Sequence, residues 1–120
     1  MSSPKILLVD DDTQFLEATE YMLKYENYEV ITAKNGEEAV KKYKESPPDI
    51  VLMDLKMPVM NGYDAFFKIK KDSPDAKIVF TSSYTINNEE FEKAETAGLF
   101  GLLTKPFDLN ELNSIITSIN

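Results

Sequence analysis

The chain has 120 residues, of which 42% are hydrophobic and 28% charged, as is typical of one globular domain rather than of a disordered segment. Its net charge of −8 disfavours direct binding to nucleic acid. Because the chain has no cysteine and no histidine, disulfides, thiolate or imidazole metal ligands and a histidine general base are excluded. Any bound metal must be held by oxygen atoms, as magnesium, manganese and calcium prefer. No apolar run has the length of a membrane span or a signal peptide.

The first half of the chain alternates between short apolar runs and amphipathic segments. Residues 5–9 form an apolar run of strand length, and residues 13–25 follow with apolar side chains at helical spacing. Residues 28–33 are rich in β-branched side chains, which favour a strand. An Asn-Gly turn leads into a helix over about 37–45, which a Pro-Pro pair ends. The run 50–53 is apolar throughout, the pattern of a strand covered on both faces.

The second half continues the same alternation. A helix over about 63–71 ends at a Ser-Pro-Asp turn, and residues 77–80 form another short apolar strand. A weaker helix over 87–97 stops at a glycine, and residues 100–103 form the last strand. An aspartate caps the final helix, whose apolar side chains over 109–119 form one stripe. Five strands alternating with five helices predict one α/β domain, a doubly wound parallel sheet with right-handed crossovers.

Residues able to do chemistry follow four of the five strands. Asp10 and Asp11 follow the first strand, Asp54 the third, Thr81 the fourth and Lys105 the fifth. In a parallel sheet these strand ends lie on one edge, so we expect the side chains to converge. Crowded carboxylates repel one another unless a cation lies among them, and magnesium fits a site of few oxygen ligands. With an ammonium, a hydroxyl and a backbone N–H, such a site has what the oxygens of a transferring phosphoryl group need.

Each of these features has a simpler interpretation when it is taken alone. Asp54 can cap the next helix, and the run Asp10-Asp11-Asp12 can be acidic residues favoured by a helix dipole. Thr81-Ser82-Ser83 can be ordinary loop caps, and Lys105-Pro106 can end a strand. Their combination in one chain favours a site. The acidic run also lacks the alternating spacing and the glycine of an EF-hand calcium loop.

Four motifs carry a resemblance to a known family. They are Asp-Asp after the first strand, Asp-x-x-Met-Pro-x-Met-x-Gly after the third, Thr-Ser after the fourth and Lys-Pro-Phe after the fifth. In this order, and over essentially the whole chain, they resemble the receiver domain of bacterial and archaeal response regulators in two-component signalling. The resemblance implies one receiver domain over residues 1–120, a flavodoxin-like (βα)5 fold with strand order 2-1-3-4-5, and a cytoplasmic location.

The resemblance also implies a role for each motif residue. Asp54 would be the nucleophile that accepts a phosphoryl group from a sensor histidine kinase or a phosphotransfer protein. Asp11, Asp54 and the backbone carbonyl of Lys56 would hold magnesium, for which manganese or calcium can substitute, and Asp10 would act mainly through water. Lys105, joined by a cis bond to the following proline, would contact the phosphoryl oxygens. A carboxylate is already ionised at neutral pH, so the attack needs no general base.

The resemblance further implies a switch. The Thr81 hydroxyl would move onto the acyl phosphate, and Ser82 is small enough to leave that approach open. In this family the residue three before the lysine is often an aromatic that follows the threonine, but here it is Leu102. Phe100 lies two residues earlier, and period-two alternation places it on the same side as Leu102. We hypothesise that both, with Tyr84, form an apolar patch for a downstream target on the face of the last two helices and the last strand.

Three functions follow as hypotheses from the sequence. The first is a phosphorylation-driven switch or phosphorelay intermediate that catalyses only its own phosphorylation and dephosphorylation and is not a turnover enzyme. The second is a magnesium-dependent aspartyl-phosphate phosphatase, which usually carries an acid–base aspartate where this chain has Lys56. The third is a constitutive protein-binding module that is never phosphorylated, and the complete set of site residues disfavours it.

Overall fold

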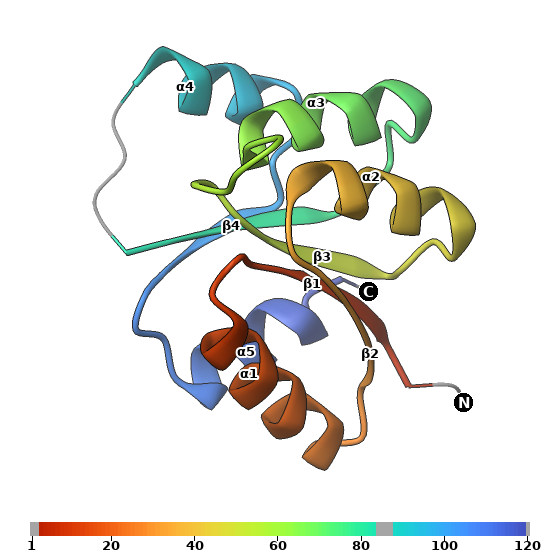
Figure 1. Ribbon diagram of the computed structural model, residues 1–120, viewed down its shortest axis with the longest axis vertical. Helices are drawn as coiled ribbons and strands as arrows, with labels where there is room; N and C mark the ends of the chain where they lie inside the picture. Colours follow the sequence, from red (N-terminus) through yellow and green to blue (C-terminus); the bar gives the residue numbers. More distant parts are fainter. Residues whose placement is uncertain (1–2, 84–87, 120) are drawn as a thin grey trace.

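The computed structural model describes residues 3–83 and 88–119 and shows a five-stranded parallel sheet in the order β2-β1-β3-β4-β5. The strands are β1 (Lys5–Val9), β2 (Glu29–Ala33), β3 (Ile50–Asp54), β4 (Ile78–Ser82) and β5 (Gly101–Thr104). Helices α2 (Gly36–Glu45), α3 (Gly62–Asp72) and α4 (Glu89–Thr96) cover one face, and α1 (Thr13–Tyr25) and α5 (Leu109–Thr117) cover the other (Figure 1). The predicted doubly wound fold and strand order are therefore confirmed.

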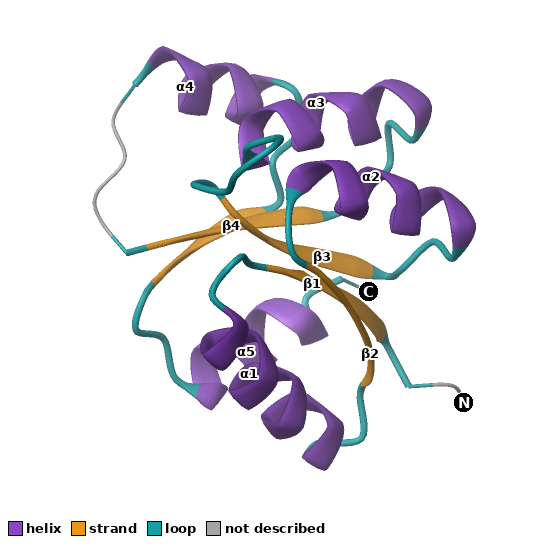
Figure 2. Cartoon of the chain, viewed as in Figure 1, coloured by secondary structure: helices purple, strands orange, loops and turns teal. Residues whose placement is uncertain are grey.

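The helices begin where capping side chains replace missing hydrogen bonds. Each of the five described helices follows an Asn or Asp whose side-chain oxygen accepts a backbone amide of the first turn; these caps are Asp12, Asn35, Asn61, Asn88 and Asp108. The last of these caps, Asp108, agrees with the prediction from the sequence. Because each described helix is the next element after a strand, the capped ends lie toward the carboxyl edge of the sheet (Figure 2).

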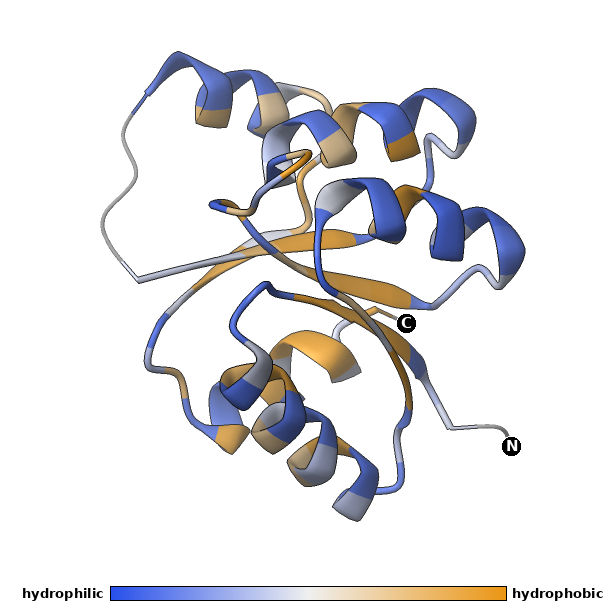
Figure 3. Cartoon of the chain, viewed as in Figure 1, coloured by the Kyte–Doolittle hydropathy of each residue, from blue (hydrophilic) through white to orange (hydrophobic). Residues whose placement is uncertain are grey.

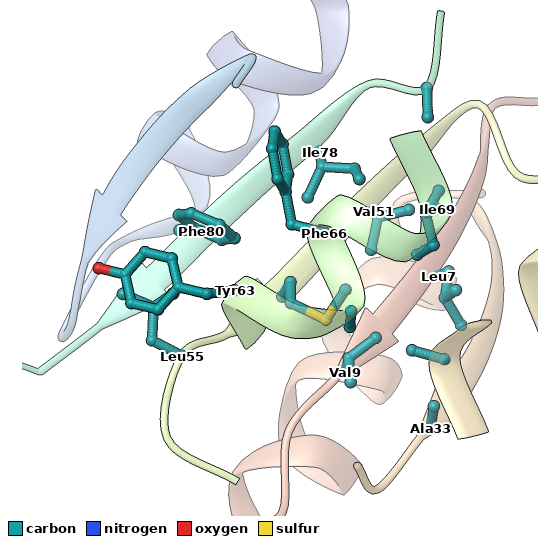
Figure 4. Packing of buried hydrophobic residues seen from close by; sticks show 14 of the residues in the cluster. Leu7, Val9, Ala33, Val51, Leu55, Tyr63, Phe66, Ile69, Ile78 and Phe80 are labelled. Carbon is teal, nitrogen blue, oxygen red and sulfur yellow. The ribbon is translucent and has the colours of Figure 1, made fainter. Parts of the chain in front are cut away.

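The core lies on both faces of the sheet. Central β3 is buried from Ile50 to Met53, and the strands are the most hydrophobic part of the chain (Figure 3). On the side of α3, the ring of Phe80 packs edge-on against Tyr63 and Phe66, at centroid distances of 5.2 and 5.4 Å (Figure 4). This packing on two sides fixes the end of β3, where Asp54 stands.

Several strand ends differ from the prediction by one or two residues. β4 continues through Thr81 and Ser82, which were expected to follow it, because Thr81 pairs with Asp54 of β3 and Ser82 with Thr104 of β5. β5 begins at Gly101 rather than one residue earlier. Among the described residues, no helix is both long and apolar enough to cross a membrane.

Candidate functional site

The carboxyl ends of the strands lie at one edge of the sheet (Figure 1), and the predicted polar residues stand at these ends. Asp54 is the last residue of β3 and lies in register with Thr81 of β4. Asp10 directly follows β1, the strand that pairs with β3 on its other side, and Lys105 directly follows β5. Residues that lie far apart in the sequence therefore meet at the carboxyl ends of neighbouring strands, where open α/β sheets bind ligands.

Three carboxylates form the centre of this site. One oxygen each from Asp10, Asp11 and Asp54 lies within 4.8 Å of the other two, a grouping that could hold a metal ion. Asp10 is buried, and its orientation is fixed because its Oδ1 accepts the backbone N–H of Asp12 at 2.9 Å. Asp54 Oδ1 accepts the N–H of Leu55 at 3.0 Å. A set made only of oxygen donors suits a hard divalent cation such as magnesium.

The ammonium group of Lys105 reaches into the acidic cluster. Lys105 Nζ lies 2.6 Å from Asp10 Oδ2 and 3.7 Å from Asp54 Oδ1. The backbone N–H of Lys105 donates to the carbonyl of Ser82 at 2.6 Å, and the bond to Pro106 is cis, as the resemblance implied. The main chain of β4 therefore holds the lysine at the rim, with its side chain pointing at both carboxylates.

Negative charge nevertheless dominates the site. Burial first, and then the charge of Asp10, raises the pKa of Asp54 from 3.8 to about 6. Asp11 acts in the same direction, while the Lys105 ammonium lowers the pKa of Asp54 without cancelling the rise. The Lys105 ammonium does not balance the three grouped carboxylates, and a divalent cation among them would supply further positive charge.

Two glycines fix the loop that follows β3. A Cβ atom on Gly62 would lie 2.4 Å from the carbonyl oxygen of Asp54, so only glycine lets the start of α3 approach the strand end this closely. A Cβ atom on Gly36 would lie 2.4 Å from the carbonyl oxygen of Met60, which accepts the Gly36 N–H at 2.9 Å. Residues 55–61 are thus held against α2 and α3. From the sequence, Gly36 was predicted only as part of a turn, and its contact with this loop was not.

The other predicted site residues lie at different depths. Thr81 and Ser82 are buried at the end of β4, and Thr81 is next to Asp54 in the sheet. Lys56 is exposed in the loop after β3, two residues beyond Asp54. Tyr84, which was expected to contribute to an apolar patch, lies outside the described residues.

The prediction that Phe100 and Leu102 lie on the same side of their strand needs correction. Phe100 precedes β5 and packs against the same apolar cluster as Leu103, on the side of α1 and α5. Leu102 is 37% exposed and, by alternation along β5, points to the opposite face from Leu103. The alternation does not extend back to Phe100 because the strand begins only at Gly101. The exposed patch is therefore reduced to Leu102 among these residues.

An aromatic pair at the site was not predicted. Lys105 Nζ lies 4.3 Å from the ring centroid of Phe15, and the ring of Phe107 packs edge-on against Phe15 at 5.9 Å and 89°. The helical spacing of residues 13–25 predicted Phe15 only as part of the apolar stripe of this helix. The position of Phe15 in the sequence could have indicated this contact, because the residue lies in the first turn of α1, which begins at the carboxyl edge of the sheet.

The fold and this edge define a class: a doubly wound α/β domain with a cluster of carboxylates around an aspartate at the end of its central strand. The family model described as "response regulator receiver domain" matches residues 6–117. The chain therefore belongs to the response-regulator receiver domain family.

Known relatives support this membership over nearly the whole chain. The chemotaxis protein CheY of Thermotoga maritima is 38% identical over 117 residues, which cover 97% of each chain. A CheY-like receiver domain from Methanospirillum hungatei superposes with a TM-score of 0.90 at 31% identity, covering 98% of this chain and 93% of the other. The response regulator TrrA of Thermotoga maritima, solved in complex with Mg2+ and BeF, has a TM-score of 0.84 at 31% identity and is covered completely, as is this chain. The chain spans about half the length of the curated transcriptional regulators that it also matches.

Proposed function

We propose that this receiver domain is a magnesium-dependent phosphoacceptor and that Asp54 accepts a phosphoryl group from a phosphohistidine of a sensor histidine kinase or phosphotransfer protein. The observation that carries the proposal is the position of Asp54, which lies beside two further carboxylates and 3.7 Å from the ammonium of Lys105. With a pKa of about 6, most Asp54 side chains are ionised at pH 7 and able to act as a nucleophile.

Asp54, Lys105 and Thr81 have different roles in the phosphoryl transfer. An oxygen of Asp54 attacks phosphorus while the P–N bond to the donor imidazole breaks, and the imidazole leaves with the electron pair. Lys105 contacts the phosphoryl oxygens, and the Thr81 hydroxyl donates to the acyl phosphate. Because the nucleophile is already an anion, no general base is required, which is consistent with a chain that has no histidine.

Magnesium would be held by Asp11, Asp54 and the backbone carbonyl of Lys56, with Asp10 acting through water. When bound, the ion supplies the positive charge that lets an anionic donor approach an anionic nucleophile. The acyl phosphate would then bias an existing equilibrium of Thr81 and β5, and the face of α4, β5 and α5 would bind the downstream target or pass the signal along a relay. A turnover phosphatase would need an acid–base group where Lys56 stands, so we propose that the chain is no turnover enzyme.

Phosphorylation by a small donor tests this proposal directly. The purified chain is incubated with acetyl phosphate and magnesium, and its intact mass is followed with time. We expect a gain of one phosphoryl group that chelation of magnesium prevents and that Asp54→Asn abolishes. Asp64→Asn is the matched control, because it removes an exposed carboxylate from the first turn of α3.

Other results would support different functions. Repeated release of phosphate from a phosphate monoester, rather than from the acetyl phosphate that loads the switch, would indicate a turnover enzyme. If neither acetyl phosphate nor a phosphohistidine donor modified the wild-type chain, the result would favour a constitutive binding module. A mass gain that survived Asp54→Asn would place the acceptor elsewhere.

A further inference from the structure

The ammonium of Lys105 is held from three directions. Its Nζ lies 2.6 Å from Asp10 and 3.7 Å from Asp54, while the face of the Phe15 ring lies 4.3 Å away, measured to the centroid. At this distance the negative face of an aromatic ring attracts a cation. The ring is thus a third partner of the lysine, and the only one of the three without a formal charge.

Independent elements keep Phe15 and Lys105 together. Phe15 lies in the first turn of α1, where the cap Asp12 accepts its backbone N–H at 3.2 Å. Phe107 packs edge-on against the ring at 5.9 Å, so the Lys-Pro-Phe segment folds over Phe15. The backbone of Lys105 is fixed separately, through its hydrogen bond to Ser82. The ring therefore constrains the long side chain, which the backbone contact alone would leave free to rotate.

Resting on the proposed function, we propose that Phe15 is a positioning residue for phosphoryl transfer: its ring face holds the Lys105 ammonium beside Asp54. A carboxylate in the place of the ring would add negative charge to a site that already has an excess. An aliphatic side chain would fill the space without attracting the ammonium. An aromatic face attracts the cation and still leaves it able to move from Asp10 to the incoming phosphoryl oxygens.

The test separates the charge of the ring face from the volume of the side chain. Phe15→Leu keeps an apolar side chain, Phe15→Tyr keeps the ring, and phenylalanines carrying one to three ring fluorines keep the shape while weakening the face. The rate of phosphorylation is measured at saturating magnesium. Acetyl phosphate is the donor because a small molecule removes any effect of the substitutions on the docking of a kinase. We expect Phe15→Leu to be about three- to tenfold slower, Phe15→Tyr to match wild type, and the rate to fall steadily with each fluorine.

Two further measurements identify a purely structural role. The midpoint of thermal unfolding of each variant reports damage to the fold, and Phe67→Leu, which alters a partly exposed ring on α3, is the matched control. Proton NMR of the Lys105 ε-methylene reports the contact itself, because a ring face shifts nearby protons to lower frequency. We expect this shift in wild type and its loss in Phe15→Leu.

The outcomes are distinguishable. A Phe15→Leu chain that is phosphorylated at the wild-type rate, or rates that do not depend on the number of fluorines, would overturn the positioning role while leaving the phosphoacceptor function intact. A wild-type chain that takes up no phosphoryl group would overturn both, and that result is seen before any substitution is made. Slow phosphorylation together with an unchanged unfolding midpoint and a lost NMR shift would support the inference.

Discussion

At the scale of single residues, the surroundings of Asp54 act on its pKa in opposite directions. Burial and the charge of Asp10 favour its neutral acid, whereas the Lys105 ammonium and the N–H of Leu55 favour the carboxylate. The result is a group with a pKa of about 6, which is ionised at pH 7 but whose ionisation opposes folding. The negative charge that would make Asp54 a nucleophile thus also makes the metal-free protein less stable.

The stability of the metal-free chain should therefore depend on Asp54 in a defined pH window. The Asp54 carboxyl group has its ordinary pKa of 3.8 in the unfolded state, which therefore releases the proton at a lower pH than the folded state does. Between about pH 4 and pH 6 the folded state still holds this proton, so stability falls as the pH rises through this range. At pH 7 the full cost is present and is of order 1–3 kcal/mol. We expect Asp54→Asn to increase the free energy of unfolding in urea by about this amount at pH 7 and to change it little below pH 4. An Asp54→Asn chain less stable than wild type at pH 7 without magnesium would contradict this account.

At the scale of elements, the loop between β3 and α3 contains a strained residue. Val59 has a φ of 68°, in the left-handed region that β-branched residues avoid, and its side chain is 75% exposed and gains little from packing. We expect Val59→Asn to increase the free energy of unfolding by about 1 kcal/mol, because asparagine tolerates this conformation. Urea unfolding measures the change.

The chain contains a matched control for this prediction. Asn27, which follows α1, has nearly the same φ of 69°. Asn27→Val should therefore decrease the free energy of unfolding by a similar amount. If Asn27→Val behaves in this way and Val59→Asn brings no gain, then the backbone at residue 59 is not strained.

The elements also show which features could be read from the sequence. The apolar run of β3 and the aspartate after it depend on local pattern, and both were predicted. The extension of β4 through Ser82 depends on pairing with two neighbouring strands, and polar residues such as serine give no local sign of it. The contact of Phe15 with Lys105 joins residues 90 positions apart and requires the packing of α1 beside the end of β5. Phe100 was misplaced because alternation was extended one residue beyond the start of its strand.

At the scale of the whole molecule, the candidate metal site joins segments that are distant in the chain. Its carboxylates follow β1 and end β3, so an ion that binds them is released when the sheet unfolds. Such an ion binds the folded state alone and stabilises the entire domain. The net charge of −8 adds a nonspecific effect, because any salt screens repulsion among the acidic side chains.

A comparison of magnesium with sodium separates these two effects. Magnesium at 100 times its dissociation constant should add about 2.7 kcal/mol to the free energy of unfolding. Sodium chloride at equal ionic strength should add less, because it only screens charge. Asp11→Asn should remove most of the magnesium increment, whereas Glu37→Gln, the same charge change in the first turn of α2, should leave it unchanged. Equal increments in the two variants, measured by urea unfolding with each salt, would mean that magnesium acts through the overall charge and not through a site at the carboxyl edge of the sheet.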